Sequence, residues 1–169
     1  DTLWLRLIQD LDHCDGTVTA GTSLCQSSMG WVFHMLSGII EIAPRFRSPY
    51  VYGAPVLSVI TGDKEGAKIL FERGITQFPH DWSLQYQAAY HYLIELKQPE
   101  RAAELLVLAG KNGAPQWVFA LAARIYTEKG QALLAKSILE EMLNKDPDSR
   151  FAARLKSRLD EVNKILEAK

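Results

Sequence analysis

Apolar residues recur every three or four positions along most of the chain, which is the spacing of one face of an α-helix. The first such stripe predicts a helix over residues 2–13 and consists of Trp4, Leu7, Ile8 and Leu11. Leu3 and Leu5 lie off this stripe, and we expect both to pack on neighbouring helices. The alternative is contact with a missing segment, a membrane surface or a second copy of the chain.

Residues 14–26 are predicted to form a loop, because they are rich in Gly, Thr, Ser and Asp. Ser27 or Ser28 can cap a second helix that continues to about Ala43. Its main apolar stripe consists of Met29, Val32, Phe33, Leu36, Ile39, Ile40 and Ala43. A second stripe of Trp31, Met35 and Ile42 predicts that this helix is covered on two sides.

Proline, glycine and aspartate punctuate the rest of the chain and predict seven more helices. Their expected starts are Ser48-Pro49, Asp63, Asp81, Pro99, Pro115, Gln131 and Pro147 or Asp148. Ser48 and Asp81 are expected to cap the helices that they begin. The last helix has an apolar stripe of Phe151, Leu155, Leu159, Val162 and Leu166. Its other side carries Arg150, Arg154, Lys156, Arg158 and Lys164. A helix that caps a solenoid needs one solvated side, which explains these charged residues. The alternative is that the charged side binds an acidic partner or membrane headgroups.

One stretch of the sequence occurs twice, first between Gly62 and Pro79 and again between Gly130 and Pro147. The paired positions are Gly62 with Gly130, Ala67 with Ala135, Phe71 with Leu139, Gly74 with Met142, and Pro79 with Pro147. A third copy lies between them, with Ala102 near the midpoint and with Lys97 and Gln98 in place of the turn glycine. Glycine allows a tight turn and alanine allows close helix contact, so the regular spacing indicates stacked helix hairpins.

These residues resemble the tetratricopeptide repeat family, whose unit is about 34 residues of helix, turn and helix. The resemblance covers residues 48–81, 82–115 and 116–149. It implies a single domain over residues 1–169: an all-α, right-handed solenoid of antiparallel helix hairpins with nine helices. Residues 1–47 would form a diverged first hairpin, and residues 150–169 a capping helix. Such arrays serve many roles, so the fold alone implies little beyond how a partner is held.

The composition is ordinary for one globular domain, with 169 residues of which 47% are hydrophobic and 23% charged. The net charge of −1 argues against a nucleic-acid binder. The sequence contains no uninterrupted apolar run of the length, about 18 residues, that would span a membrane. It opens on Asp1 rather than on methionine, so an export signal or a membrane tether would lie upstream.

No motif for catalysis is recognisable in the sequence. The histidines are His13, His34, His80 and His91, and none belongs to an H-E-x-x-H pair. A glycine-rich phosphate loop, a G-x-S-x-G elbow and a convergent carboxylate pair are equally missing. We therefore predict no enzymatic activity, no cofactor and no bound metal, and we expect His91 to have a core or groove role.

The two cysteines, Cys14 and Cys25, flank the predicted loop. Their separation lets both lie at the ends of adjacent antiparallel helices, within reach of a disulfide. Two free thiols are the first alternative, and the redox compartment decides between these two states. A metal site with His13 and His34 is the second, but the spacing does not match a C-x2-4-C knuckle.

The resemblance implies that the first helix of each hairpin lines a concave groove that binds peptides or partner helices. Carried onto this chain, the principal lining positions are Tyr52, Val56, Tyr86, Tyr90, Trp117 and Arg124. Members that grip a C-terminal carboxylate carry lysine, asparagine and arginine there, whereas here only Arg124 is cationic. Aromatic residues favour an apolar segment instead.

The sequence therefore predicts a non-enzymatic protein-interaction module, an adaptor or assembly scaffold that binds a partner peptide or helix. The alternative is a structural subunit that self-associates through residues 1–43. The lone pair of cysteines around one loop and the missing initiator methionine favour export to the periplasm over the cytoplasm.

Overall fold

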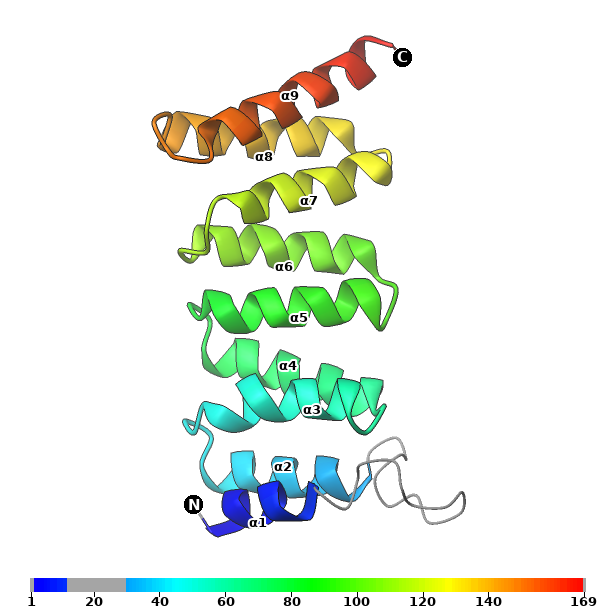
Figure 1. Cartoon of the computed structure of the whole chain (residues 1–169), viewed down its shortest axis with the longest axis vertical. Helices are drawn as coiled ribbons and strands as arrows, with labels where there is room; N and C mark the ends of the chain where they lie inside the picture. Colours follow the sequence, from blue (N-terminus) through cyan, green and yellow to red (C-terminus); the bar gives the residue numbers. More distant parts are fainter. Residues whose placement is uncertain (1, 12–29, 169) are drawn as a thin grey trace. The chain divides into compact units, whose positions relative to one another are not determined.

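The computed structural model describes residues 2–11 and 30–168, and every regular element in these ranges is a helix (Figure 1). No strand occurs in the described ranges, which confirms the predicted all-α class. The chain divides into two compact units, residues 1–79 and residues 80–169. The predictions for His13, Cys14, Cys25, Ser27 and Ser28 lie outside the described residues. The prediction of one domain over residues 1–169 stays a prediction.

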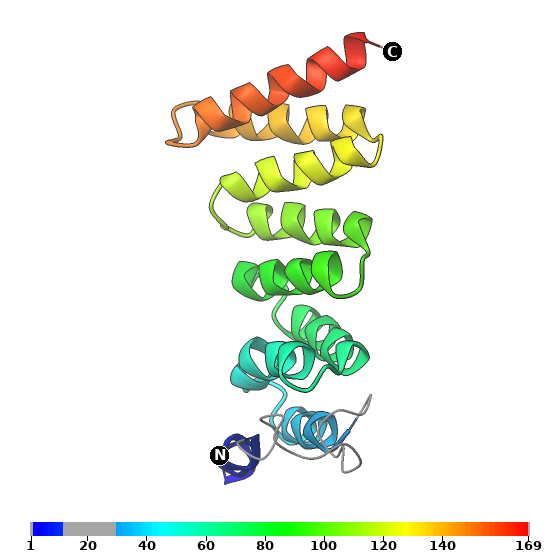
Figure 2. The same cartoon turned by 45° about the vertical axis from the view of Figure 1, so that its right-hand side comes forward.

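The first unit contains, among its described residues, α1 (Thr2–Leu11), α2 (Trp31–Ile42), the π-helical turn η2 (Pro49–Gly53), α3 (Ala54–Val59) and α4 (Lys64–Gln77). α1 packs on α2, α3 packs on α4, and η2 packs on both α2 and α4 (Figure 2). The core side chains include Leu7, Val32, Phe33, Leu36, Leu57, Leu70 and Phe71. Gly53 permits the close approach of η2 to α2, because a Cβ there would lie 2.5 Å from Leu36 Cδ2.

The third predicted helix begins differently from the expectation. Ser48 has helical backbone angles (φ −56°, ψ −42°) and makes no capping hydrogen bond, so the prediction of a serine cap is wrong. The segment continues as η2 before it becomes regular in α3. Pro55 gives the physical reason: it has no N–H for the carbonyl of Val51 and its ring would crowd that carbonyl. A wider π-turn over residues 49–53 relieves the crowding.

The second unit contains α5 (Trp82–Ile94), α6 (Pro99–Lys111), α7 (Trp117–Glu128), α8 (Ala132–Lys145) and α9 (Ala152–Glu167). Each of these helices packs on the next one, and α7 also packs on α9 (Figure 1). The largest buried side chains are Tyr92, Phe119, Leu84, Leu105, Leu106, Leu139 and Leu155. The predicted apolar stripe of the last helix is confirmed at two of its positions, because Leu155 and Val162 are fully buried.

The predicted cap at Asp81 is confirmed, and Asp63, which was expected only as the start of a helix, is a cap as well. The Asp63 carboxylate accepts a hydrogen bond from the Gly66 N–H at 2.9 Å. The Asp81 carboxylate accepts from the N–H groups of Ser83 and Leu84 at 3.1 and 3.2 Å. These bonds satisfy N–H groups that have no partner inside their own helix, so they fix the starts of α4 and α5.

Three helix starts were predicted too early. α2 begins at Trp31, because Gly30 has extended rather than helical backbone angles (φ −72°, ψ −168°). α7 begins at Trp117 because the carbonyls of Pro115 and Gln116 first close tight turns with Val118 and Phe119. α9 begins at Ala152 rather than at Pro147 or Asp148. There Ser149 Oγ accepts from the Phe151 N–H, and such a local side-chain bond competes with helix formation.

The repeated positions of the sequence share their structural environment. Ala67, Ala102 and Ala135 are all fully buried, as predicted. The turn before each of these alanines contains one residue with positive φ: Gly62 (68°), Lys97 (55°) and Gly130 (77°). The next residue in each turn donates its N–H to a carbonyl of the preceding helix at 2.8 Å. A left-handed turn conformation is thus kept even where glycine is replaced by lysine.

Helix C-caps also recur along the chain, at regular steps. Phe78, Asn112 and Asp146 cap α4, α6 and α8, and they follow one another at equal steps along the chain. The Phe78 ring meets the Tyr50 ring edge to face at 5.7 Å. Asn112 donates to Gln85 Oε1 at 3.0 Å, and Asp146 accepts from Gln116 Nε2 at 3.0 Å. In each case the side chain of the C-cap residue contacts a residue near the start of the preceding helical segment.

Candidate functional site

The predicted groove residues fall into two sets, one in each compact unit. Tyr52 and Val56 belong to the first unit, and Tyr86, Tyr90, Trp117 and Arg124 belong to the second. The structure brings residues together within each set. A continuous groove along all of them stays a prediction.

Tyr52 and Val56 line an apolar cleft between α1 and the η2–α3 segment. The cleft has a volume of about 380 Å³ and is lined by Trp4, Leu7, Ile8, Leu11, Ser48, Tyr52, Gly53 and Val56. No charged side chain is among the lining residues, and the Ser48 hydroxyl and the Tyr52 phenol are the main polar groups. Tyr52 is 61% exposed, so its ring is available to a partner. A cleft of this size and lining suits an apolar side chain or segment.

The outer surface of α1 extends this apolar region. Leu3 and Leu5 are 45% and 58% exposed, so the expected packing of both on neighbouring helices is wrong. Ile42 is 76% exposed, so one member of the second stripe of α2 is also uncovered. A second cavity of about 350 Å³ lies between α1 and the end of α2. The Trp4 ring meets Phe46 edge to face at 5.7 Å, and Trp4 lines both cavities.

The aromatic residues predicted for the second unit are partly assembled. The rings of Tyr86 on α5 and Trp117 on α7 meet edge to face, with centroids 5.6 Å apart. Both are half-buried, so each packs against the unit and still presents a face to solvent. Tyr90 is 57% exposed on α5, one helical turn after Tyr86 and therefore on the same side of the helix. These three residues form the aromatic patch of the second unit.

Arg124 is not a free cation. Its guanidinium forms an ion pair with Glu128, one turn later in α7, with a Nε to Oε1 distance of 2.7 Å. The hydrogen bond with Glu128 raises the pKa of Arg124 above its ordinary value, and the charge of Glu128 acts in the same direction. Because Glu128 offsets the positive charge, Arg124 is less suited to bind the carboxylate of a partner.

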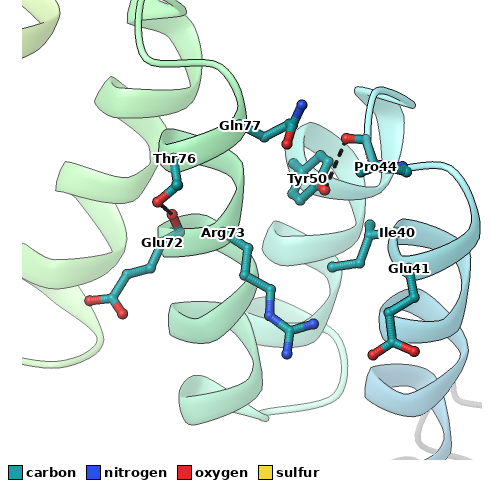
Figure 3. Close-up of a pocket in the computed structure, with 8 residues that line it drawn as sticks. All are labelled: Ile40, Glu41, Pro44, Tyr50, Glu72, Arg73, Thr76 and Gln77. Carbon is teal, nitrogen blue, oxygen red and sulfur yellow. Dashed lines mark hydrogen bonds between the residues drawn. The ribbon is translucent and has the colours of Figure 1, made fainter.

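A third cavity lies in the first unit, between the end of α2 and the end of α4 (Figure 3). Its volume is about 390 Å³, and it is lined by Ile40, Glu41, Pro44, Tyr50, Glu72, Arg73, Thr76 and Gln77. The Tyr50 hydroxyl donates to the Pro44 carbonyl at 3.1 Å, which fixes the inner wall. Burial raises the pKa of the Tyr50 phenol, while the positive charge of Arg73 lowers it by less. Sequence analysis missed this cavity, because its walls come from segments that lie far apart in the chain.

The basic side of α9 is partly neutralised. Arg158 forms an ion pair with Glu161 on the same helix. The guanidinium of Arg150 lies 4.7 Å from the centroid of the Phe151 ring, which is a cation–π contact. Arg154, Lys156 and Lys164 are exposed. This distribution is typical of a solvated capping surface.

The histidines do not gather into a chemical site in the described part of the chain. His91 is buried, as one of its two predicted roles requires. His80 contacts Asn112 Oδ1 at 3.3 Å, and His34 is exposed beside the Phe33 ring. The described residues contain no cluster of three metal-ligating side chains. None of the described helices is long and apolar enough to cross a membrane.

Comparison of the sequence with protein-family models and with curated proteins finds no match to either.

Proposed function

We propose that this chain is a non-enzymatic protein-interaction module of the tetratricopeptide type, built from antiparallel helix hairpins stacked in a right-handed solenoid. Three periodic features support this proposal. Buried alanines recur at positions 67, 102 and 135, turn residues with positive φ at 62, 97 and 130, and C-caps at 78, 112 and 146. A unit of two helices that repeats in this way buries its apolar faces by stacking on its neighbours.

The proposed partner is an apolar peptide or helix. The observation that carries this proposal is the uncharged cleft of about 380 Å³ beside the exposed Tyr52 ring. The Tyr86–Trp117 pair adds a second aromatic surface of the same chemistry. Tyrosine and tryptophan offer a large apolar face with one polar group, and such residues dominate binding energy at protein interfaces. The Arg124–Glu128 pair disfavours a partner held by its terminal carboxylate.

A peptide-display selection on the folded chain, followed by fluorescence anisotropy on the enriched peptides, tests this function. Truncation of a central aromatic anchor costs about 2 kcal/mol. Tyr86→Ala and Tyr52→Ala should therefore each weaken binding by about 30-fold, since about 1.4 kcal/mol is a factor of ten. Arg158→Ala on α9 serves as the matched control and should change little. Binding should depend only mildly on salt, because few charges take part.

Circular dichroism must show that the tyrosine variants are folded, since Tyr86 is half-buried. If folded Tyr86→Ala and Tyr52→Ala variants bind the peptides normally while Arg158→Ala does not, the aromatic surfaces are the wrong site. The basic side of α9 is then the binding surface.

Self-association through residues 1–43 is the second candidate function, and the exposure of Leu3, Leu5 and Ile42 favours it. Isolated large apolar side chains are common on surfaces, but a group beside two apolar cavities indicates a contact. Sedimentation velocity at two concentrations should then show a dimer, which Leu5→Glu abolishes. A concentration-independent monomer removes this candidate.

A further inference from the structure

The cavity between α2 and α4 is lined by charged as well as apolar residues, whereas the apolar cleft has no charged lining residue. Its inner wall is apolar and fixed: Ile40 and Tyr50 are almost fully buried, and the Tyr50 hydroxyl is held by the Pro44 carbonyl. Its mouth carries the exposed charges of Arg73 from α4 and Glu41 from α2. Figure 3 shows both side chains extending toward the same side of the cavity, whereas the carboxylate of Glu72, which also lines the cavity, extends away from them.

Arg73 and Glu41 do not form an ion pair with each other or with another described residue. Arg73 instead lies close enough to Tyr50 for its charge to lower the tyrosine pKa. The mouth therefore presents one positive and one negative group above an apolar wall. A ligand with a single charge would gain from one of these groups and be repelled by the other. A ligand with both charges would be attracted by both.

We propose that this cavity binds a small zwitterion of the α-amino-acid type with an apolar side chain. The carboxylate faces Arg73, whose planar guanidinium suits a carboxylate, and the ammonium faces Glu41. The apolar side chain lies against Ile40, Pro44 and Tyr50. The volume of about 390 Å³ is in the range of small-molecule sites. This site is distinct from the cleft and the aromatic patch, so it goes beyond the proposed protein-interaction function.

The test is an NMR titration of the whole chain with L-leucine, N-acetyl-L-leucine and L-leucinamide. The acetyl derivative lacks the ammonium, and the amide lacks the carboxylate. Leucine should give saturable shifts in the amides of residues 40–44 and 72–77, with a Kd on the order of 1 mM for so small a ligand. Each derivative should bind at least about tenfold more weakly, because it loses one charge-assisted contact.

Variants locate the site. Glu41→Gln and Arg73→Gln should each weaken leucine binding by about tenfold or more. Glu41→Gln should weaken leucinamide but not N-acetyl-leucine, and Arg73→Gln should do the reverse. Lys68→Gln is the matched control, because Lys68 is a cation on the same helix that pairs with Glu65 instead. Equal binding of all three compounds, saturable shifts elsewhere, or no saturable shift at all would overturn the proposal. Because no peptide partner is involved, these results are independent of the display experiment.

Discussion

The contact between α6 and α7 can be tested by adding one methyl group. Gly110 lies in the last turn of α6 directly against the ring of Phe119, which is 1% exposed. A Cβ at Gly110 would lie within 2.7 Å of three carbons of that ring, whereas ordinary van der Waals contacts begin near 3.4 Å. The Phe119 ring is enclosed by the core and cannot simply turn away. We therefore expect α6 and α7 to be forced apart in Gly110→Ala.

The expected magnitude follows from two opposing effects. Alanine gains up to about 1 kcal/mol over glycine in a helix, and overpacking a core costs about 1–3 kcal/mol. Gly110→Ala should thus lower the free energy of unfolding by up to about 2 kcal/mol, measured by urea denaturation monitored by circular dichroism. Gly38→Ala on α2 is the matched control: a Cβ there meets nothing within 4 Å, so the change should stabilise. If both variants are stabilised alike, the ring does not lie on Gly110 and the α6–α7 packing is incorrect.

Three further changes test the other local features. Asp81→Ala removes the cap of α5 and should cost about 1 kcal/mol in urea denaturation, whereas Asp148→Ala, at an exposed residue that caps no described helix, should cost little. Burial raises the pKa of Tyr50 above its ordinary value of 10.0, so the neutral phenol is favoured in the folded state. The free energy of unfolding should therefore fall as pH rises above about 10, and Tyr50→Phe should lessen that fall. At neutral pH the same variant should lose about 1 kcal/mol, because it lacks the hydrogen bond to the Pro44 carbonyl. Burial raises the pKa of Tyr126 as well, so a residual alkaline loss is expected in Tyr50→Phe, and an unchanged pH profile would refute the role of Tyr50. Lys97→Gly should raise the free energy of unfolding by about 1 kcal/mol, because lysine is strained at φ 55°. Gly130→Ala should lower the free energy of unfolding by a similar amount. Changes of the opposite sign in the two variants would contradict the turn geometry.

The sequence was sufficient where a local rule decides the structure. Asp81 was predicted as a cap because a carboxylate one residue before an apolar-periodic segment satisfies free N–H groups of the first turn, and Asp63, expected only as a helix start, follows the same rule. The buried alanines could be identified because only a small residue recurs where two helices touch. The same rule misled at Ser48, since the nearby Pro55 favours a π-turn whose helical backbone reaches back to the serine itself.

The candidate sites were less predictable, because they depend on contacts between distant segments. Tyr52 and Val56 were expected in a groove, but nothing in the sequence indicated that α1 forms the opposite wall of their cleft. Arg124 was expected at the edge of the groove as a cation, yet its spacing from Glu128 places a partner one helical turn away. An i, i+4 search for opposite charges would have found that pair. No comparable signal connects Glu41 with Arg73, which line one cavity because α2, η2 and α4 pack together.

The departure of the middle repeat from a strict period has a physical explanation in its turn. The step from Ala67 to Ala102 is longer than the step from Ala102 to Ala135, and the positive-φ residues Gly62, Lys97 and Gly130 follow the same two unequal steps. Because the C-caps Phe78, Asn112 and Asp146 keep equal steps, the extra residue lies between Phe78 and Lys97, and it is removed again before Asn112. The N–H of Gln98 still reaches the Tyr92 carbonyl at 2.8 Å, as the N–H of Asp63 reaches the Leu57 carbonyl. The feature that recurs is thus a left-handed turn conformation together with its hydrogen bond. Glycine adopts this conformation with the least strain, but the turn does not require glycine. A repeat search that demands glycine misses this turn, whereas one that follows the buried alanine does not.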